Sequence, residues 1–383
     1  MSDENDDEHQ IWLSNKDKLY ETMYNQKMKV AAMTFQWLPG STIEKNVVQQ
    51  KFVTGTYDED EIYLKVGQFD GPLGTSEVSG DDNKPKSRYI LEIPHSGDVN
   101  RARYCPKKPN LVATINDKGL VQVFDTNKTA KDCLVKTLRH HNQNGFGLAF
   151  AGSTSTLASA ADDGTIALWE IDGEGETPIT KLNVDFGVND VKFKKTAQNV
   201  FGIVTESKTL AAYDSRGAAP IFEVKDAHDD AINSLDFHPK SSHLLATASH
   251  DNTVALWDDR FLSHKLHSLM GHSAEVTSVE WSPFNDNVLA SGSDDKRVLL
   301  WDISKIGQEQ APDDIEDGAP EVLFMHGGHI HSVNEFNWNP EHNWTIGSVS
   351  GDLTMQIWRP KDAIVNAGKE LRGMSSINDS ELE

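Results

Sequence analysis

The fold is decided by the stretch GHSAEVTSVEWSPFNDNVLASGSDDKRVLLWD, which runs from Gly271 to Asp302. It opens with a Gly-His pair, continues with alternating apolar runs and closes with Trp-Asp. Runs such as VTSVEW fit half-buried strands, and SPFND and SDDK fit the turns between them. The stretch therefore predicts short strands joined by turns, and its meaning depends on how often the pattern recurs along the chain.

The pattern recurs with a nearly constant period. An aromatic residue closes a short apolar run six times, at Phe124, Trp169, Tyr213, Trp257, Trp301 and Trp358. The successive gaps in residue number are 45, 44, 44, 44 and 57. A His precedes five of the six at one fixed offset, at His95, His140, His228, His272 and His329, whereas the third unit has Val184 there. The pattern resembles the WD repeat of β-propellers, which has four strands per blade.

Acidic residues repeat in the same frame. An Asp precedes the closing aromatic residue by six positions in four units, at Asp163, Asp251, Asp295 and Asp352. Repeated His and Asp residues suggest a metal or catalytic site, but no pair stands at ligand spacing, and a propeller distributes them around its ring. In WD repeats such residues hydrogen-bond within their own blade. We therefore interpret them as structural residues.

The repeats predict the number of blades. Six units span residues 90–360, and residues 33–70 contain three further strand-like runs that supply another blade. A chain of this kind closes its ring by pairing the two termini in one blade, which leaves no free sheet edge. We therefore predict an all-β fold, a seven-bladed WD-repeat β-propeller with an N-terminal α-helix and a short C-terminal helix.

The helices are expected outside the ring. Residues 8–26 place five apolar or aromatic residues near helical spacing, namely Ile11, Trp12, Leu19, Tyr20 and Met23. The expected segments are an acidic start with the N-terminal helix (1–28), the propeller (29–360, with a polar loop at 71–88 and an acidic insert at 308–322), and a short helix with a disordered acidic tail (361–383).

Composition limits the classes of partner. The chain has 59 acidic and 36 basic residues and a net charge of −23, so its surface repels DNA phosphates and anionic lipid. No segment approaches the roughly 18 consecutive apolar residues of a membrane span. The first ten residues, MSDENDDEHQ, are neither a secretory signal nor a transit peptide, and two cysteines form no disulfide framework. We expect an intracellular protein that contacts neither nucleic acid nor membrane directly.

The long last gap locates an insertion. It exceeds the usual gap of 44 by 13, while His329 keeps the fixed offset from Trp358. The extra residues therefore precede His329, in QEQAPDDIEDGAPEV (308–322), which we place in the link from the sixth to the seventh unit. No Lys or Arg occurs from Ile306 to Trp358. The insertion thus puts uncompensated acidic charge beside the expected meeting point of the two termini.

The insertion has two interpretations. A solvated loop tolerates extra residues at little energetic cost, so filler is the simpler one. Binding is favoured because Ile315 stands among the acidic residues and because Pro312, Gly318 and Pro320 shape the loop ends. The natural ligand is a basic amphipathic helix, whose apolar side contacts Ile315 and the N-terminal helix while its Lys and Arg side chains meet the carboxylates.

Several motifs resemble one family. WDISKIGQEQAPDDIEDGAPEVLFMHGGH, SVNEFNWNPEHNWTIGSVS and VNRARYCPKKPNLVATIN are similar to the retinoblastoma-binding type of WD-repeat histone chaperone. IWLSNKDKLY and TFQWLP extend the resemblance, which covers roughly residues 11–365. Within that family, VATINDKG and IGQEQAPDDIEDGAPE look most like the fungal histone-binding subunit of the type B histone acetyltransferase.

The resemblance implies two binding sites. The first helix of histone H4 would lie between the N-terminal helix and the insert, with the residues Asp313, Asp314, Ile315, Glu316, Asp317, Leu19, Met23 and Ile364. A basic tail such as that of histone H3 would bind the propeller rim at Asp98, Asn100, Arg101, Phe146, Glu206, Asn233 and Glu275. Asn144, Asn189, Ser332 and Gly351 replace charged residues that are common at this rim in relatives.

The resemblance also implies a function without catalysis. No GxSxG elbow, P-loop or HExxH motif is present, and no cofactor or metal is expected. We expect a subunit that presents histones H4 and H3 to a catalytic histone acetyltransferase subunit, with other histone chaperones as further partners, in nucleus and cytoplasm. The alternatives are a histone-binding subunit of a chromatin-assembly or corepressor complex and, more remotely, a generic WD-repeat adaptor of a ubiquitin ligase.

Overall fold

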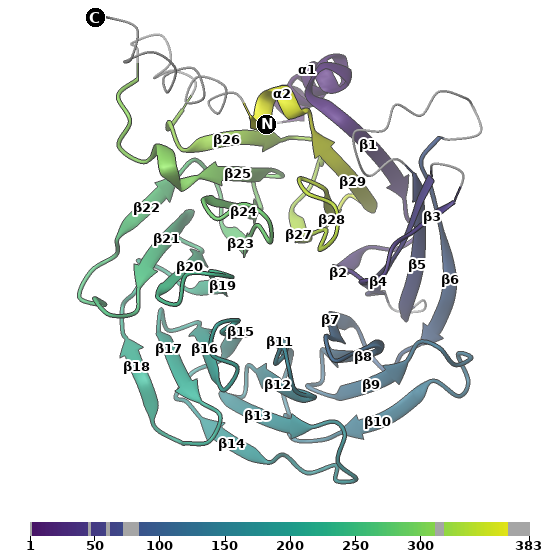
Figure 1. Cartoon of the computed structure of the whole chain (residues 1–383), viewed down its shortest axis with the longest axis vertical. Helices are drawn as coiled ribbons and strands as arrows, with labels where there is room; N and C mark the ends of the chain where they lie inside the picture. The colour runs from purple at the N-terminus through teal and green to yellow at the C-terminus, as the bar shows by residue number, and fades with distance from the viewer. Residues whose placement is uncertain (1, 45–46, 59–61, 72–83, 311–317, 367–383) are drawn as a thin grey trace, which may run out of the picture.

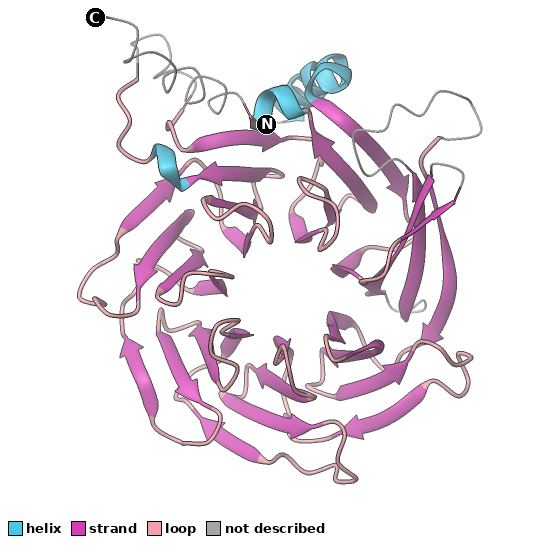
Figure 2. Cartoon of the chain, viewed as in Figure 1, coloured by secondary structure: helices cyan, strands magenta, loops and turns pink. Residues whose placement is uncertain are grey.

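The strands are arranged in a closed ring around a central channel (Figure 1). The computed structural model of the chain describes residues 2–44, 47–58, 62–71, 84–310 and 318–366. These residues form seven antiparallel sheets, which confirms the predicted seven-bladed β-propeller. Figure 2 shows that strands dominate and that the helices lie at the outer edge of the ring.

Each blade is a sheet of four consecutive positions from the channel outwards. The first three blades comprise β2 (Ala32–Trp37), β4 (Val47–Thr56), β5 (Tyr63–Gly71) and β6 (Lys86–Pro94), with β3 (Thr42–Glu44) added to β4; β7 (Val99–Cys105), β8 (Lys108–Asn116), β9 (Val121–Asp125) and β10 (Leu134–Leu138); and β11 (Gly145–Phe150), β12 (Thr156–Ala161), β13 (Thr165–Glu170) and β14 (Thr180–Asn183).

The remaining four blades follow the same order. They comprise β15 (Val188–Phe193), β16 (Val200–Thr205), β17 (Leu210–Asp214) and β18 (Pro220–Val224); β19 (Ile232–Phe237), β20 (Leu244–Ser249), β21 (Thr253–Asp258) and β22 (His267–Met270); β23 (Val276–Trp281), β24 (Val288–Ser293), β25 (Val298–Asp302) and β26 (Val322–His326); and β27 (Val333–Trp338), β28 (Ile346–Ser350), β29 (Thr354–Pro360) and β1 (Tyr20–Lys27).

The middle strands of each blade are buried because neighbouring blades cover both of their faces. In the sixth blade, every residue of β24 is buried, and so are the first four residues of β25. The hydrophobic clusters extend across blade boundaries: Trp301 of the sixth blade packs in one cluster with Leu256 of the fifth. This double burial explains why the repeats contain nearly continuous apolar runs with small residues rather than strict alternation.

The recurring His and Asp residues tie turns together within blades, as predicted. In the sixth blade, His272 contacts Asp295 at 2.8 Å through Nδ1 and Ser291 at 2.7 Å through Nε2. The Trp301 indole N–H donates to the same Ser291 hydroxyl at 2.8 Å. Equivalent networks are centred on His228 and His329.

One member of the His series was placed wrongly. In the third blade the network is made by His141, whose Nδ1 and Nε2 lie 2.7 Å from Thr165 and Ser159. His140, which stands at the fixed offset from Trp169, packs beside this network as a ring neighbour of His141. The reason is that the turn between β11 and β12 is one residue shorter than the corresponding turns of the fifth and sixth blades.

The seventh blade combines both ends of the chain, which confirms the predicted closure. Strand β1 pairs antiparallel with β29, with Tyr20 opposite Pro360 and Lys27 opposite Thr354. Helix α1 covers only Ser2–Leu19, so the expected helix over residues 8–26 is wrong beyond Leu19. Tyr20 and Met23 belong to the strand, because the backbone from Tyr20 onwards pairs with the otherwise open edge of β29.

Two connections also differ from expectation. The polar loop expected at 71–88 is shorter, because β6 already begins at Lys86, while residues 72–83 lie outside the described part. The acidic insert does not link two blades. It connects β25 to β26 within the sixth blade, after a short 3-10 helix at Ile303–Lys305. The short C-terminal helix is confirmed as α2 (Asp362–Val365).

Candidate functional site

Both ends of the acidic insert are fixed to the sixth blade. The Gln310 side-chain amide donates to the Gly318 carbonyl at 2.9 Å, and the Asp302 N–H donates to the Glu321 carbonyl at 2.8 Å. Glu321 is buried and lies 3.1 Å from His267 of the fifth blade. The residues Asp313, Asp314, Ile315, Glu316 and Asp317 lie outside the described part of the chain. The structure thus fixes where the insert leaves and re-enters the sheet.

The apolar residues predicted for the helix-binding site are brought together. Leu19, Met23 and Ile364 are all half-buried and pack on one hydrophobic cluster built around Trp358 and Phe324. The Lys361 N–H donates to the Leu19 carbonyl at 2.9 Å, which places the start of α2 against the end of α1. Three segments that are distant in sequence therefore meet beside β26, as Figure 1 shows.

A groove of about 830 Å³ runs between α1 and the outer part of the sixth blade. Its apolar lining comes from α1, from β26 and from the link after β26, namely Ile11, Trp12, Leu19, Met325 and Ile330. Ile11 is 62% exposed, Met325 46% and Ile330 57%, so this groove keeps large apolar side chains in contact with water. An exposed apolar groove bordered by polar residues is typical of a surface that binds another protein.

The polar border of the groove is asymmetric. Lys296 and Arg297 line it at the turn between β24 and β25, and His9 and Asn15 line it from α1. Leu19 lies at the opposite end of α1, where α2 and the strand that follows the insert begin. Of the groove residues, sequence reasoning identified Leu19 for this site and missed Met325 and Ile330. The available signal was an outward-facing apolar residue on the outermost strand β26.

The residues predicted for the rim lie on one face of the propeller. Asp98 and Glu275 precede the innermost strands β7 and β23, whereas Glu206 follows the second strand β16. Because neighbouring strands are antiparallel, these positions occupy the same end of their sheets. Asp98 and Asn100 line a hollow of about 440 Å³ with Asp294, His331, Met33 and Tyr57.

Two of the predicted rim residues are already used to join blades. The Asn100 amide donates to the Gly145 carbonyl of the next blade at 2.9 Å, and the Asn233 amide donates to the Val276 carbonyl at 2.9 Å. Asn189 and Asn334 make the same contact to their neighbouring blades. Phe146 occupies the equivalent position in the third blade and is half-buried. These side chains therefore have a structural role whatever binds at the rim.

Arg101 points into the channel rather than out of it. Its guanidinium lies 3.2 Å from Asp190 and 3.8 Å from Glu335, and both carboxylates are buried. Burial alone would raise the pKa of Glu335, but Arg103 and Arg101 outweigh it and hold that pKa at about 2. Glu280, in the same channel, has its pKa raised to about 7 by burial and by Asp236. The channel thus contains a network of paired charges.

The acidic rim residues remain available to a ligand in different degrees. Glu206 is exposed, and partial burial together with Glu206 raises the pKa of the neighbouring Asp162. Burial followed by the charge of Asp117 raises the pKa of Asp98. Glu275 lies 3.3 Å from His250. Carboxylates whose pKa values are raised by one another favour a bound cation, because a positive charge relieves their repulsion.

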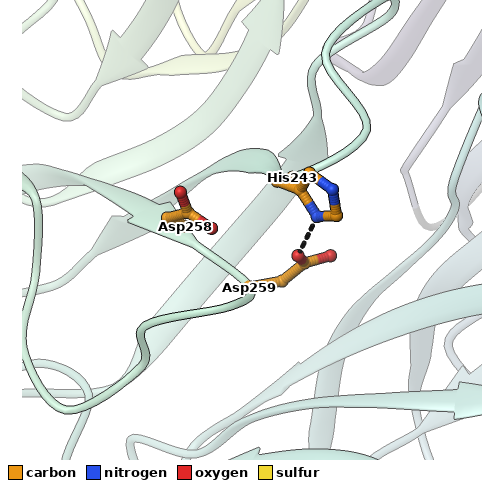
Figure 3. Close-up of side chains that lie close together, drawn as sticks. All are labelled: His243, Asp258 and Asp259. Atoms are coloured by element: carbon orange, nitrogen blue, oxygen red, sulfur yellow. Dashed lines mark hydrogen bonds and ion pairs between the residues drawn. The ribbon is translucent and has the colours of Figure 1, made fainter.

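One cluster has the residue types of a metal site. His243, Asp258 and Asp259 place ligand atoms close together at the outer end of the fifth blade (Figure 3). Asp258 is paired with Arg260 at 2.6 Å, and Asp259 is bonded to Lys194 at 2.6 Å and to His243 at 2.7 Å. The carboxylate oxygens are thus already neutralised by protein cations. This geometry describes a salt-bridge network between the fourth and fifth blades.

Comparisons with known proteins agree with the fold. Residues 7–73 match the family model of the histone-binding protein RBBP4 and the corresponding subunit of the CAF1 complex. Residues 132–170, 220–258 and 263–302 match the WD domain, G-beta repeat. Within the described residues, no helix has the length and apolar character needed to cross a membrane.

Curated relatives cover nearly the whole chain. A protein of Schizosaccharomyces pombe is 41% identical, with 94% of this chain and 90% of the relative aligned. A protein of Eremothecium gossypii is 38% identical, with 94% and 87% aligned, and one of Candida glabrata is 35% identical, with 95% and 91% aligned. Each of the three is named histone acetyltransferase type B subunit 2.

Proposed function

The chain belongs to the histone acetyltransferase type B subunit 2 family of WD-repeat proteins, and from this membership we propose that it is the non-catalytic, histone-binding subunit of a type B histone acetyltransferase. Its task would be to hold histone H4 where the catalytic partner reaches the H4 tail. Positioning of this kind lowers the entropic cost of bringing the two together. A role with nuclear histones follows, and newly made histones would be met in the cytoplasm.

The observation that carries the proposal is the groove beside α1. It combines exposed Ile11, Met325 and Ile330 with the half-buried Leu19, and it lies next to the point where β26 begins after the acidic insert. An amphipathic helix buries its apolar face in such a groove. We propose that the first helix of histone H4 binds here, with Asp313, Asp314, Glu316 and Asp317 meeting its basic side chains and Ile315, Met23 and Ile364 extending the apolar contact.

The groove is tested by Met325→Lys. The added cation removes an apolar contact and repels a basic ligand, so affinity for a peptide of the first H4 helix should fall about tenfold or more. The matched control is Met270→Lys, because Met270 is 67% exposed on β22, the equivalent outermost strand of the fifth blade. Equal affinity of the two variants, measured by calorimetry, would show that the peptide does not use the groove.

The insert is tested separately by the double change Asp313→Lys and Asp314→Lys. Both residues belong to a loop whose two ends are fixed independently, so folding should persist while binding of the same peptide is lost. A thermal midpoint equal to that of the unchanged chain checks the fold. Full affinity at moderate salt would remove the insert from the proposed site.

We also propose that the rim takes a basic tail such as that of histone H3. Asp98, Glu206 and Glu275 would supply the charge, since Arg101, Asn100 and Asn233 are engaged within the propeller. Asp98→Asn combined with Glu206→Gln should weaken binding of an H3 tail peptide roughly fivefold. Glu223→Gln, on the outermost strand β18, is the control. A tail affinity unchanged in the double variant would exclude this rim.

The biological complex is tested by purification from native extract. A catalytic histone acetyltransferase subunit that co-purifies with this chain and histones supports the proposed assignment. Histones without an acetyltransferase would instead indicate a chromatin-assembly or corepressor complex.

A further inference from the structure

A buried chain of hydrogen bonds connects α1 to the sixth and seventh blades beneath the groove. The Trp12 indole N–H donates to the Tyr20 hydroxyl at 3.0 Å, and that hydroxyl lies 2.8 Å from His326 Nδ1. His326 Nε2 lies 2.9 Å from Gln356 Oε1, and Gln356 Nε2 donates to the Gly328 carbonyl at 3.0 Å. The chain thus links one groove residue, Trp12, to the core of the seventh blade.

Only one set of proton positions satisfies every member of this chain. Gln356 uses its N–H on the Gly328 carbonyl, so its oxygen faces His326 and accepts. His326 therefore carries its proton on Nε2, and Nδ1 of the neutral ring is an acceptor. The Tyr20 hydroxyl must donate to Nδ1, which leaves its lone pair for the Trp12 N–H. A second proton on His326 would remove the acceptor and break the link to Tyr20.

The surroundings keep the chain neutral. His326 is fully buried and stacks on Trp358 with ring centroids 4.2 Å apart and an angle of 6°. Burial lowers the pKa of His326 well below its ordinary value, and it raises the pKa of Tyr20 well above its own. Neither group ionises near neutral pH, so the chain persists under physiological conditions.

A glycine allows α1 to approach this closely. A Cβ at Gly328 would clash with Gln356 and would lie 2.8 Å from His326 and 2.9 Å from the Trp12 ring. Any side chain there would push Trp12 away or break the chain. Met325 and Gly327, on either side of His326, line the groove together with Trp12. The position of α1 and the shape of the groove are therefore set at the same point.

We propose that Tyr20 and His326 are positioning residues of the groove, and that α1 docks in its binding position only while His326 is neutral. The coupling of α1 to His326 stands on the geometry alone. Its effect on the ligand rests on the proposed function, namely on the groove binding an H4 helix.

The direction of the pH effect follows from proton uptake. When α1 leaves, His326 loses the cover of Tyr20 and Trp12, and its pKa moves back towards 6.5, the ordinary value for His. The undocked state then binds more protons below that pH, so docking is complete above it and weakens as the pH falls, by at most about tenfold per unit. The facing titratable groups are His329, 5.6 Å from the His326 ring, Asp352, 3.5 Å from His329, and His9, which stacks on Trp12.

Hydrogen exchange of the full chain tests the coupling directly. Tyr20→Phe keeps the ring packing but leaves the Trp12 N–H and His326 Nδ1 without their partner, so amides of residues 10–19 should exchange about tenfold faster. The matched control is Tyr24→Phe on the same strand, whose hydroxyl accepts from the Ser87 N–H at 3.0 Å, away from α1. Protection of α1 in Tyr20→Phe within twofold of the control would overturn the proposal.

The pH response gives a second reading. Protection of α1, corrected for the intrinsic exchange rate, should fall between pH 7 and 5.5 in the unchanged chain. His326→Phe keeps an aromatic ring on Trp358 but cannot take up a proton, so its response should be flat over this range. A response of the same size in His326→Phe would assign the titration to His9 or His329 and overturn the role of His326.

Peptide binding separates this proposal from the proposed function. If an H4-helix peptide without His binds the unchanged chain, Tyr20→Phe should weaken it about as much as it weakens α1 protection, whereas Tyr24→Phe should not. If the peptide fails to bind the unchanged chain, the proposed function is wrong while hydrogen exchange still decides the coupling. Normal peptide affinity in a Tyr20→Phe chain with a deprotected α1 would show that α1 does not form the site.

Discussion

At the residue scale, Glu335 connects three blades through one carboxylate. It stands on β27 of the seventh blade and accepts from the Thr34 hydroxyl at 2.6 Å and the Phe35 N–H at 2.9 Å, both in the first blade. It also forms an ion pair with Arg103 of the second blade. A buried carboxylate is stable only when such partners replace water, and removal of one member leaves the others uncompensated.

This arrangement makes stability depend on acid. The pKa of Glu335 falls from 4.5 to about 2 on folding, so its contribution is complete above pH 4.5 and is lost as the pH falls towards 2. Glu335→Gln should therefore lower the free energy of unfolding by about 3 kcal/mol at pH 7, and the difference should shrink between pH 4.5 and 2. Urea unfolding at several pH values measures this. The exposed Glu174→Gln is the control, and an equal effect of both would contradict the assignment.

The same scale shows what sequence could predict of single residues. The His and Asp networks were predictable, because they repeat in the frame of the aromatic residues. The shift from His140 to His141 was not, because one turn differs by a single residue. Arg101 was expected at the rim, but its partners Asp190 and Glu335 are far away in sequence and lie across the channel. Only the closed ring brings such charges together.

At the element scale, β1 determines whether the ring is closed. It covers the edge of β29 and places Tyr20 among Trp358, Phe324 and His326. Sequence reasoning extended the helix through this strand because Ile11, Trp12, Leu19, Tyr20 and Met23 fit a helical period. The alternative was not visible locally. An open strand edge near the other end of the chain decides the conformation of Tyr20–Lys27.

Truncation tests the role of this strand. Removal of residues 1–27 exposes the edge of β29 and the core around Trp358, so the thermal midpoint should fall by roughly 10 °C or more and the chain should aggregate. Removal of residues 1–8 leaves Trp12 and β1 in place and should change the midpoint by less than about 2 °C. Similar midpoints for both truncations, measured by calorimetry, would show that β1 does not hold the ring.

At the scale of the whole molecule, charge and shape act together. A net charge of −23 attracts basic proteins from a distance, whereas the groove beside α1 supplies the apolar contact that holds them. The fold class and blade number followed from the period of the sequence. The groove itself did not, because Met325 and Ile330 become neighbours of Ile11 only after the two ends of the chain meet.

This division predicts a limited dependence on salt. Binding of an H4-helix peptide should weaken roughly three- to tenfold between 50 and 300 mM salt, since exposed charge pairs are screened over this range. The remaining affinity should be lost in Met325→Lys at either salt concentration. Affinity that does not change with salt would mean that apolar contact alone holds the peptide, and the acidic insert would then have no role in binding.

The pairing of β1 with β29 also sets when during synthesis the protein can act. The ribosome makes Tyr20 early and its partner Pro360 near the end of the chain, roughly 20 to 70 s afterwards at ordinary rates of translation. During that interval α1 has no sixth or seventh blade to lie on, so the groove does not exist. We expect ribosome-bound chains arrested at residue 350 to capture no H4-helix peptide, and released full-length chains to capture it. Histone would thereby be committed only to a finished molecule, and capture by arrested chains would disprove this.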